Sequence, residues 1–452
     1  MKRSAWRYLW TSVDIRKKLL MTLFLLALYR LAANIPVPGI NRGVIASIFA
    51  QSGAASNLLG IFDLLSGGTL SNFSILSMGV YPYITAQIII QLLIPLIPAL
   101  EKKIRDNPKE GQKISERYTM MLTIPMAALS AFGQIQLFNQ IAGGASILNY
   151  SFGFGSANLL PTLTTLISMM GGTMLAIWLG ELISEHGIPK QGLSLIIFAG
   201  IVSRIPVQIY GLLVSGETFE TIATLLIIMF IILALSILAI AFVQQGRRNV
   251  PVLFPGRRVG NRMSMPVRSN LPLMVNMAGM IPLIFAQTIL TLPAILAQFF
   301  INSKTEWLAN LAVGLQSTFN IGSIWYVIIF FILVLLLTFF YTEVLFEQQN
   351  YGENLKKQGA QIPGVIRGEP TQRYLNKVQR RITLVGALFL AVVAALPYFL
   401  QLVLPEGIAK QSGLFLVNTA GLLIVVGVVR DTFNIIETEL KLHGYEDSLI
   451  KG

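Results

Sequence analysis

The sequence has 452 residues, of which 54% are hydrophobic and only 12% are Asp, Glu, Lys or Arg. A soluble domain carries about 25% charged residues, so this composition excludes an ordinary soluble protein and predicts a polytopic membrane protein. Cysteine is absent, which excludes disulfides, thiolate nucleophiles and cysteine-bound zinc or iron–sulfur sites. The two histidines, His186 and His443, are too few and too far apart in the sequence to indicate a metal site.

Ten stretches are apolar enough, over about 20 residues each, to cross a bilayer as helices. In chain order they are 19–35, 75–96, 120–138, 160–183, 192–214, 221–243, 272–297, 324–342, 382–404 and 413–433. The first has an alternative interpretation as a cleaved signal peptide, because it follows basic residues and ends in small ones. Arg30 interrupts its apolar run and no soluble protein follows it, so a membrane span is favoured. The predicted fold class is an all-α polytopic membrane protein with ten transmembrane helices.

The basic residues fall almost entirely on one side of these ten spans. Of the 34 lysines and arginines, 28 lie in the N-terminal segment, in the loops after even-numbered spans or in the C-terminal tail. Lysine and arginine accumulate in cytoplasmic loops, so both termini are predicted to be cytoplasmic. The formal net charge of +13 is therefore expected to face the cytosol.

Ten spans divide into two sets of five, at 1–214 and 215–452. An odd number per half makes the second half cross the membrane in the opposite sense to the first, and inverted halves commonly pack around a path at their interface. No internal repeat is obvious by eye, so this predicted symmetry rests on the count of spans alone.

Two predicted cytoplasmic loops, about 244–270 and 343–381, are longer than a bundle needs to connect its helices. Both are strongly basic. Their charge alone is explained equally well by the positive-inside pattern and attraction to anionic headgroups. Their length favours a docking surface for ribosomal RNA or an acidic protein partner.

The segment 56–70 (SNLLGIFDLLSGGTL) is apolar but too short to cross the bilayer. One interpretation is an amphipathic helix on the outer surface. The other is a half-helix folded back into a cavity between the two halves. Composition alone favours the surface helix.

Ionisable residues within the spans are sparse and include Arg30, Arg204, Arg430 and Asp431. A proton- or sodium-coupled transporter usually carries an acid near the membrane midplane, and none of the spans places one there. The sequence also lacks a GxxxxGK[ST] phosphate loop, an HExxH motif and a plausible Ser/His/Asp set. A small-solute transporter and a membrane-embedded enzyme are therefore both weakly supported, and the energy for any transport is expected to come from a partner or a gradient.

Six segments together resemble the bacterial SecY family. They are IPVPG at 35–39, LLSGGTLS at 64–71, YPYITAQIIIQLL at 81–93, GLSLIIFAGI at 192–201, LPLMVNMAGMIPLIFAQ at 271–287 and PGVIRGEPTQRYL at 363–375. The resemblance runs from the first span to the last in the family's order. It implies the large subunit of a protein-conducting channel, with two five-helix halves around an hourglass pore.

The resemblance further implies a function, partners and a location. The chain would pass unfolded secretory proteins across the membrane and release transmembrane segments sideways into lipid, without cofactors and without enzymatic activity. The implied partners are the small subunits SecE and SecG, the SecA motor, the translating ribosome, the unfolded preprotein with its signal peptide, and membrane lipids. The implied location is the bacterial plasma (inner) membrane.

Four groups of site residues follow from matching the motifs to the family. An aliphatic ring at the pore waist would consist of Val80, Ile84, Leu193, Ile197, Ile284 and Ile424. A plug at about 57–70, which replaces the surface helix favoured above, would include Leu58, Leu59, Ile61, Phe62, Leu64, Leu65, Ser66, Gly67 and Gly68. The lateral gate would carry Thr85, Gln87, Gln287 and Thr288. Docking of cytosolic partners would use Arg247, Arg248, Arg257, Arg258, Arg367 and Arg373.

Overall fold

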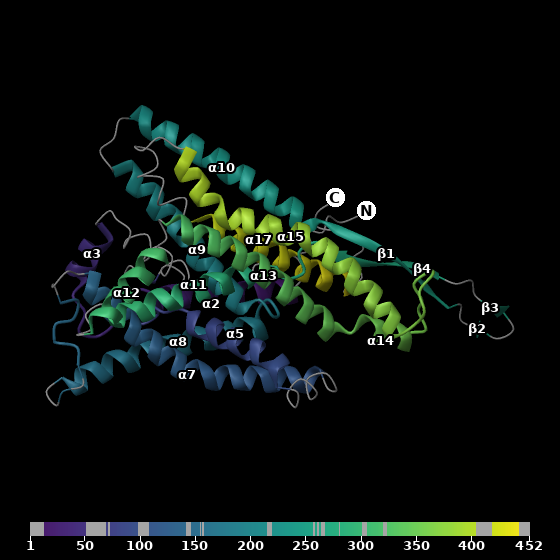
Figure 1. Cartoon of the computed structure of the whole chain (residues 1–452), viewed down its shortest axis with the longest axis horizontal. Helices are drawn as coiled ribbons and strands as arrows, with labels where there is room; N and C mark the ends of the chain where they lie inside the picture. Colours follow the sequence, from purple (N-terminus) through teal and green to yellow (C-terminus); the bar gives the residue numbers. More distant parts are fainter. Residues whose placement is uncertain are drawn as a thin grey trace. The chain divides into compact units, whose positions relative to one another are not determined.

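A computed structural model describes most of the chain, and its regular structure is mostly helical (Figure 1). The described residues are 13–50, 69–70, 73–97, 108–141, 146–153, 155, 158–214, 219–255, 258–259, 262–263, 267–279, 281–300, 305–319, 323–403 and 418–442.

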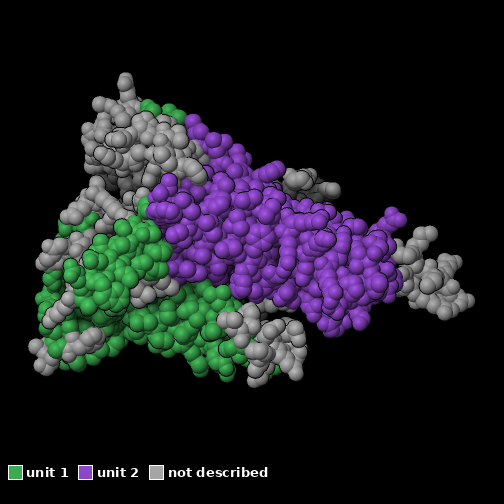
Figure 2. Space-filling view, in the orientation of Figure 1, with its two compact units in different colours: residues 1–227, 292–323, 410–452 green, residues 228–291, 324–409 purple. Residues whose placement is uncertain are grey.

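The chain forms two compact units, each assembled from separate stretches of sequence (Figure 2). Unit 1 comprises Met1–Ile227, Leu292–Ser323 and Lys410–Gly452, and unit 2 comprises Ile228–Thr291 and Ile324–Ala409. The units are thus not consecutive halves of the sequence, and the division at residue 214 stays a prediction.

Unit 1 is built from helices that are apolar along most of their length. They are α2 (Val13–Ala32), α3 (Arg42–Ala50), α5 (Tyr81–Leu96), α7 (Pro108–Ile141), α8 (Leu159–His186), α9 (Gly192–Val214), α12 (Glu306–Thr318) and α17 (Asn418–Leu442). Helix α8 packs against α2, α7 and α9, and α9 also packs against α17.

Glycines allow the backbones of unit 1 to approach closely. A β-carbon on Gly172 would lie 1.9 Å from the backbone oxygen of Ile75, and one on Gly192 would lie 1.7 Å from the backbone oxygen of Gly180. Small residues at helix crossings are the usual means of tight packing in membranes, where association relies on van der Waals contact.

Unit 2 combines long helices with a β-hairpin. Its elements are α13 (Ile324–Gln349), α14 (Tyr351–Lys357), α15 (Glu369–Val403), β1 (Arg247–Phe254), β2 (Arg258–Val259), β3 (Arg262–Met263) and β4 (Val267–Met274). Helices α10 (Phe219–Gln245) and α11 (Ile281–Phe300) each contribute residues to both units. Strands β1 and β4 pair antiparallel, with Arg247 opposite Met274 and Phe254 opposite Val267.

Two predicted spans began too early in the sequence. Residues 75–80 form turns before α5, and 272–279 complete β4 and a bend before α11. Gly79 and Gly279 adopt positive φ angles of 52° and 64°, a left-handed conformation that a continuous helix does not contain. Hydropathy misplaced both starts because it measures apolarity and is insensitive to backbone angles.

Three described helical segments are both long and apolar enough to cross a membrane. They are Leu159–His186, Ile324–Lys357 and Glu369–Leu396. Shorter apolar stretches at Tyr81–Ile94, Gly192–Ser203, Ala234–Gln245 and Ile281–Leu290 overlap four more of the ten predicted spans.

Replacing Gly172 with alanine is expected to destabilise the protein by about 1–3 kcal/mol, because the new methyl group would overlap the backbone of Ile75. Gly171 is the matched control, since a β-carbon there meets no atom within 4 Å. Its alanine variant should be neutral or stabilised by about 0.5–1 kcal/mol. Thermal unfolding of the two purified variants in detergent measures the difference, and equal melting temperatures would contradict the close contact.

Candidate functional site

Five of the six predicted ring residues lie in unit 1. Val80 directly precedes α5, and its backbone oxygen accepts a hydrogen bond from the backbone N–H of Ile84, at 3.1 Å. Val80 is buried and Ile84 is half-buried. An aliphatic constriction opposes the passage of hydrated ions because it offers them no polar ligands.

The other three ring positions of unit 1 lie on α9 and α17. These two helices pack against one another, and both Ile197 and Ile424 are buried. Leu193 is half-buried, and its Cδ2 lies 2.7 Å from where a β-carbon on Gly180 would be. Leu193 therefore also packs against α8. The sixth residue, Ile284, is buried on α11 in unit 2.

The nine named plug residues, within 58–68, lie outside the described residues. The described end of this predicted segment, Thr69 and Leu70, is fully buried. The Thr69 hydroxyl donates to the backbone oxygen of Leu76 at 2.5 Å. Leu70 belongs to a hydrophobic core that includes Phe73 and Phe138, whose rings meet edge-to-face at 5.1 Å. The chain is thus anchored immediately before α5.

The predicted gate residues divide between the two units. On α5, Thr85 is buried and its hydroxyl donates to the backbone oxygen of Tyr81 at 2.9 Å, while Gln87 is half-buried. Gln287 and Thr288 are buried on α11. Because the Thr85 hydroxyl is bonded within its own helix, this residue is less able to contact a passing chain than Gln87.

The starts of α5 and α11 share a sequence pattern that the analysis by eye missed. MGVYPYITAQII at 78–89 and AGMIPLIFAQTI at 278–289 are identical at six of twelve positions. The shared residues include the positive-φ glycines, a proline in the first helical turn and Ile84 with Ile284. Comparing the two halves at an offset of 200 residues would have revealed this repeat.

The predicted docking arginines are partly described. Arg247 and Arg248 are exposed at the start of β1, and Arg367 is exposed in the loop before α15. Arg373 is also exposed but forms an ion pair with Glu369 at 2.6 Å. Arg257 and the side chain of Arg258 lie outside the described part of the structure.

The two long basic loops fold together as one body. The backbone N–H of Leu253 donates to the oxygen of Gln361 at 2.8 Å, and the N–H of Gln361 donates back at 2.9 Å. Beneath this pair, Val250 and Val252 of the hairpin pack in one hydrophobic cluster with residues of α13, α14 and α15. The sequence predicted two separate basic loops in an all-α protein. Val250 and Val252 are the buried residues of β1 and alternate with exposed ones, a pattern of burial that the structure reveals.

The described residues contain no cluster of three or more His, Cys, Asp or Glu side chains that could bind a metal ion.

Comparisons with known proteins agree on one family. The family model described as SecY matches residues 74–433. A protein translocase subunit SecY from Chlamydia trachomatis is 36% identical over 455 residues, covering 98% of each chain. Its counterpart in Thermotoga maritima is 34% identical over 451 residues, covering 97% of this chain and 96% of the relative.

Solved structures also match along nearly the whole chain. One reported as "The structure of a protein conducting channel" has a TM-score of 0.62 at 18% identity, covering 96% of this chain and 95% of the other. A second, on the plug domain of the SecY protein, has a TM-score of 0.59 and the same coverage. The chain therefore has the fold of these solved structures, in agreement with the predicted all-α membrane fold of ten spans.

Substituting Val252 with asparagine is expected to loosen the hairpin, because a buried amide would replace an aliphatic side chain that is 2% exposed. An unsatisfied buried polar group costs about 1–3 kcal/mol, so trypsin should cleave at Arg248 and Arg268 about tenfold faster. Ser269, the exposed cross-strand partner of Val252, provides the control variant Ser269→Asn. Equal cleavage of both variants would contradict a shared core beneath the loops.

Proposed function

The chain belongs to the SecY family and is a protein-conducting channel subunit of the Sec translocon, and we propose that its polypeptide path runs through the ring predicted above. The observation that carries this proposal is relatedness over nearly the full length: the match to the Chlamydia relative covers 98% of each chain. Family membership also removes the small-solute transporter and the membrane enzyme as alternatives.

The proposed ring works by shape and apolarity. Six aliphatic side chains would surround the passing chain and yield to one residue at a time, while offering no polar ligand to a hydrated ion. The repeated pattern at α5 and α11 supports the assignment of Ile84 and Ile284 to one ring, because it gives them equivalent positions in two related segments. In the closed state the segment at about 57–70 would plug the pore from the outer side.

Transmembrane segments of the translocated chain are proposed to leave the channel sideways, according to their partition between the channel and the lipid. A sufficiently apolar segment prefers the bilayer, whereas each charged residue at its centre costs about 2.5–3.5 kcal/mol. Gln87 and Gln287, at matching positions of the repeat, are proposed to line the gate through which such segments leave.

The energy for translocation is proposed to come from partner proteins that bind the chain. The joined basic loops would present Arg247, Arg248 and Arg367 to the SecA motor or the translating ribosome, since guanidinium groups pair well with phosphates and carboxylates. SecE and SecG would complete the complex, and unfolded preproteins would be its substrates. The distribution of basic residues supports a bacterial plasma membrane location with both termini in the cytoplasm.

Replacing Ile284 with asparagine is expected to loosen the closed pore, because the amide favours water in a ring that is otherwise apolar. Export of a reporter with a defective signal sequence should rise about tenfold, the effect of about 1.4 kcal/mol on the closed state. Ile328→Asn is the control, since Ile328 is 44% exposed on α13. Unchanged export in the Ile284 variant would remove this residue from the ring.

Disulfide crosslinking tests the path directly, because the chain contains no native cysteine. A single cysteine replaces Ile284, and a secretory chain carrying its own cysteine is stalled during translocation. The proposal predicts a crosslink that depends on the stall position, and none from a cysteine at the exposed Ile328. With the stalled chain confirmed as bound, no crosslink at Ile284, Ile84 or Ile197 would show that the pore assignment is wrong.

A further inference from the structure

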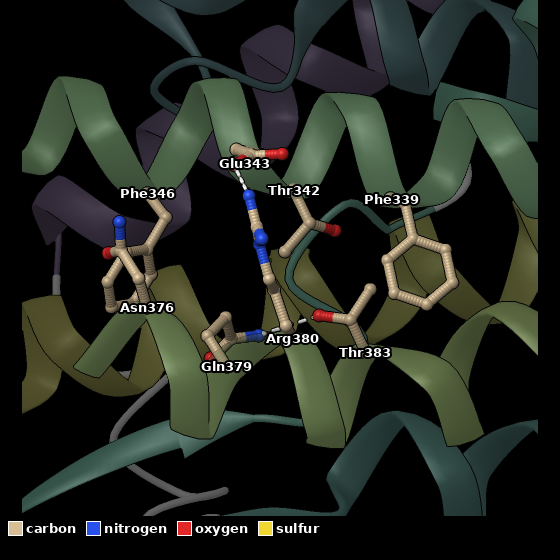
Figure 3. A pocket seen from close by; sticks show the side chains of 8 residues that line it. All are labelled: Phe339, Thr342, Glu343, Phe346, Asn376, Gln379, Arg380 and Thr383. Atoms are coloured by element: carbon tan, nitrogen blue, oxygen red, sulfur yellow. Dashed lines mark hydrogen bonds and ion pairs between the residues drawn. The ribbon is translucent and has the colours of Figure 1, made fainter. Parts of the chain in front are cut away.

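A partly open cavity lies between α13 and α15 in unit 2, and none of the residues assigned to the pore, plug or gate lines it (Figure 3). It is small, with a volume of about 20 Å³, which is room for one group the size of a water molecule or an ammonium ion. Its lining consists of Phe339, Thr342, Glu343 and Phe346 from α13 and Asn376, Gln379, Arg380 and Thr383 from α15.

The floor of this cavity holds polar atoms that lack a partner. Gln379 is 2% exposed, and its amide nitrogen donates to the backbone oxygen of Met274 at 3.3 Å and to the Thr383 hydroxyl at 3.2 Å. Because the Met274 oxygen can only accept, the Gln379 amide cannot be turned around, and its Oε1 is left without a donor. The buried Thr342 hydroxyl likewise has no partner among the described residues. Buried polar groups nearly always form hydrogen bonds. We therefore expect a bound group that donates hydrogen bonds to these two oxygens.

The mouth of the cavity carries both signs of charge. Arg380 reaches from α15 to form an ion pair with Glu343 on α13 (Figure 3). Both side chains remain substantially exposed, so the guanidinium retains N–H groups for an anion and the carboxylate retains oxygens for a cation. A ligand that pairs with both Arg380 and Glu343 needs one negative and one positive charge, so it is zwitterionic.

The predicted span boundaries place the cavity at the depth of the lipid headgroups. Thr342 is the last residue of the predicted eighth span, and Ile382 begins the ninth. From Arg380, exposed apolar residues continue into the predicted span at four-residue spacing, at Leu384, Leu388 and Val392. Four-residue spacing places side chains on one helical face.

Helix α13 carries a second stripe of the same kind. Ile332, Leu336 and Phe340 are exposed at four-residue spacing and precede Glu343 on its side of the helix. Each helix thus presents an apolar track that begins beside the charged mouth, and two tracks suit the two acyl chains of one phospholipid.

We propose that this cavity binds the headgroup of phosphatidylethanolamine. The phosphate contacts Arg380, and the ammonium group donates hydrogen bonds to Glu343, Thr342 and Gln379 Oε1. The acyl chains follow the exposed stripes of α13 and α15. Choline offers no N–H donors to the floor, and an anionic headgroup without a cation would leave the Glu343 carboxylate facing negative charge.

The test uses the full chain in nanodiscs that contain equal amounts of phosphatidylethanolamine, phosphatidylcholine and phosphatidylglycerol with identical acyl chains. After extraction and removal of loosely held lipid, native mass spectrometry counts what the protein retains. Phosphatidylethanolamine should be retained about tenfold over phosphatidylcholine, as expected for one or two added hydrogen bonds to charged groups.

Two variants locate the retained lipid. Thr342→Val removes a hydroxyl that has no protein partner, so it should leave folding intact while lowering the preference about fivefold. Arg380→Met should abolish retention of the lipid at this cavity, because it removes the contact to the phosphate. The matched controls are Thr338→Val, one turn away with its hydroxyl already bonded to the backbone oxygen of Val334, and Arg373→Met on the exposed surface.

Three outcomes would overturn the proposal. Equal retention of phosphatidylethanolamine and phosphatidylcholine would show that the floor is satisfied by water alone. Preferential retention of phosphatidylglycerol would identify an anionic headgroup site instead. A preference that survives in both Thr342→Val and Arg380→Met would place the bound lipid elsewhere on the protein.

Discussion

Backbone hydrogen bonding in a low-dielectric surrounding is the constraint on which this structure depends. Helices satisfy their own N–H and C=O groups, so irregular backbone at membrane depth has to be bonded within the protein. The turns at 73–80 meet this requirement. Val37 donates to the oxygen of Phe73 at 3.1 Å, Ile75 donates to the oxygen of Ile35 at 2.9 Å, and the Ser74 hydroxyl accepts from Leu76 at 3.2 Å. This network allows α5 to begin abruptly at Tyr81, beside two proposed ring residues.

The two long basic loops are stabilised in a different way, by side-chain packing. They are long enough to bury a small core of their own, centred on Val250, Val252 and Leu375. A single bridge between Leu253 and Gln361 joins them. Charges carried on one packed body keep a fixed spacing, which a partner with its own fixed charges can match. The positive charge of this region therefore has a defined geometry and is more than a consequence of membrane orientation.

The boundary between these two regions is the proposed lipid site. Gln379 bonds to Met274, the last residue of β4, and to Thr383, one turn further along α15. A headgroup bound there would contact both helices where the body formed by the basic loops joins the predicted spans, so membrane composition and loop position would be coupled through the same side chains. That coupling follows from the location of the cavity and requires no movement of either unit.

Sequence alone determined the class of protein, the number of spans and the family, because these depend on the sum of apolar residues over long windows and on motifs of many residues. Tertiary structure decided the starts of α5 and α11, the β1–β4 hairpin and its bridge to Gln361. Positive φ angles at Gly79 and Gly279 and pairing across about 100 residues leave no trace in local hydropathy. The unpartnered Oε1 of Gln379 likewise became visible only when α13 and α15 were packed together, because burial is a property of neighbours distant in sequence.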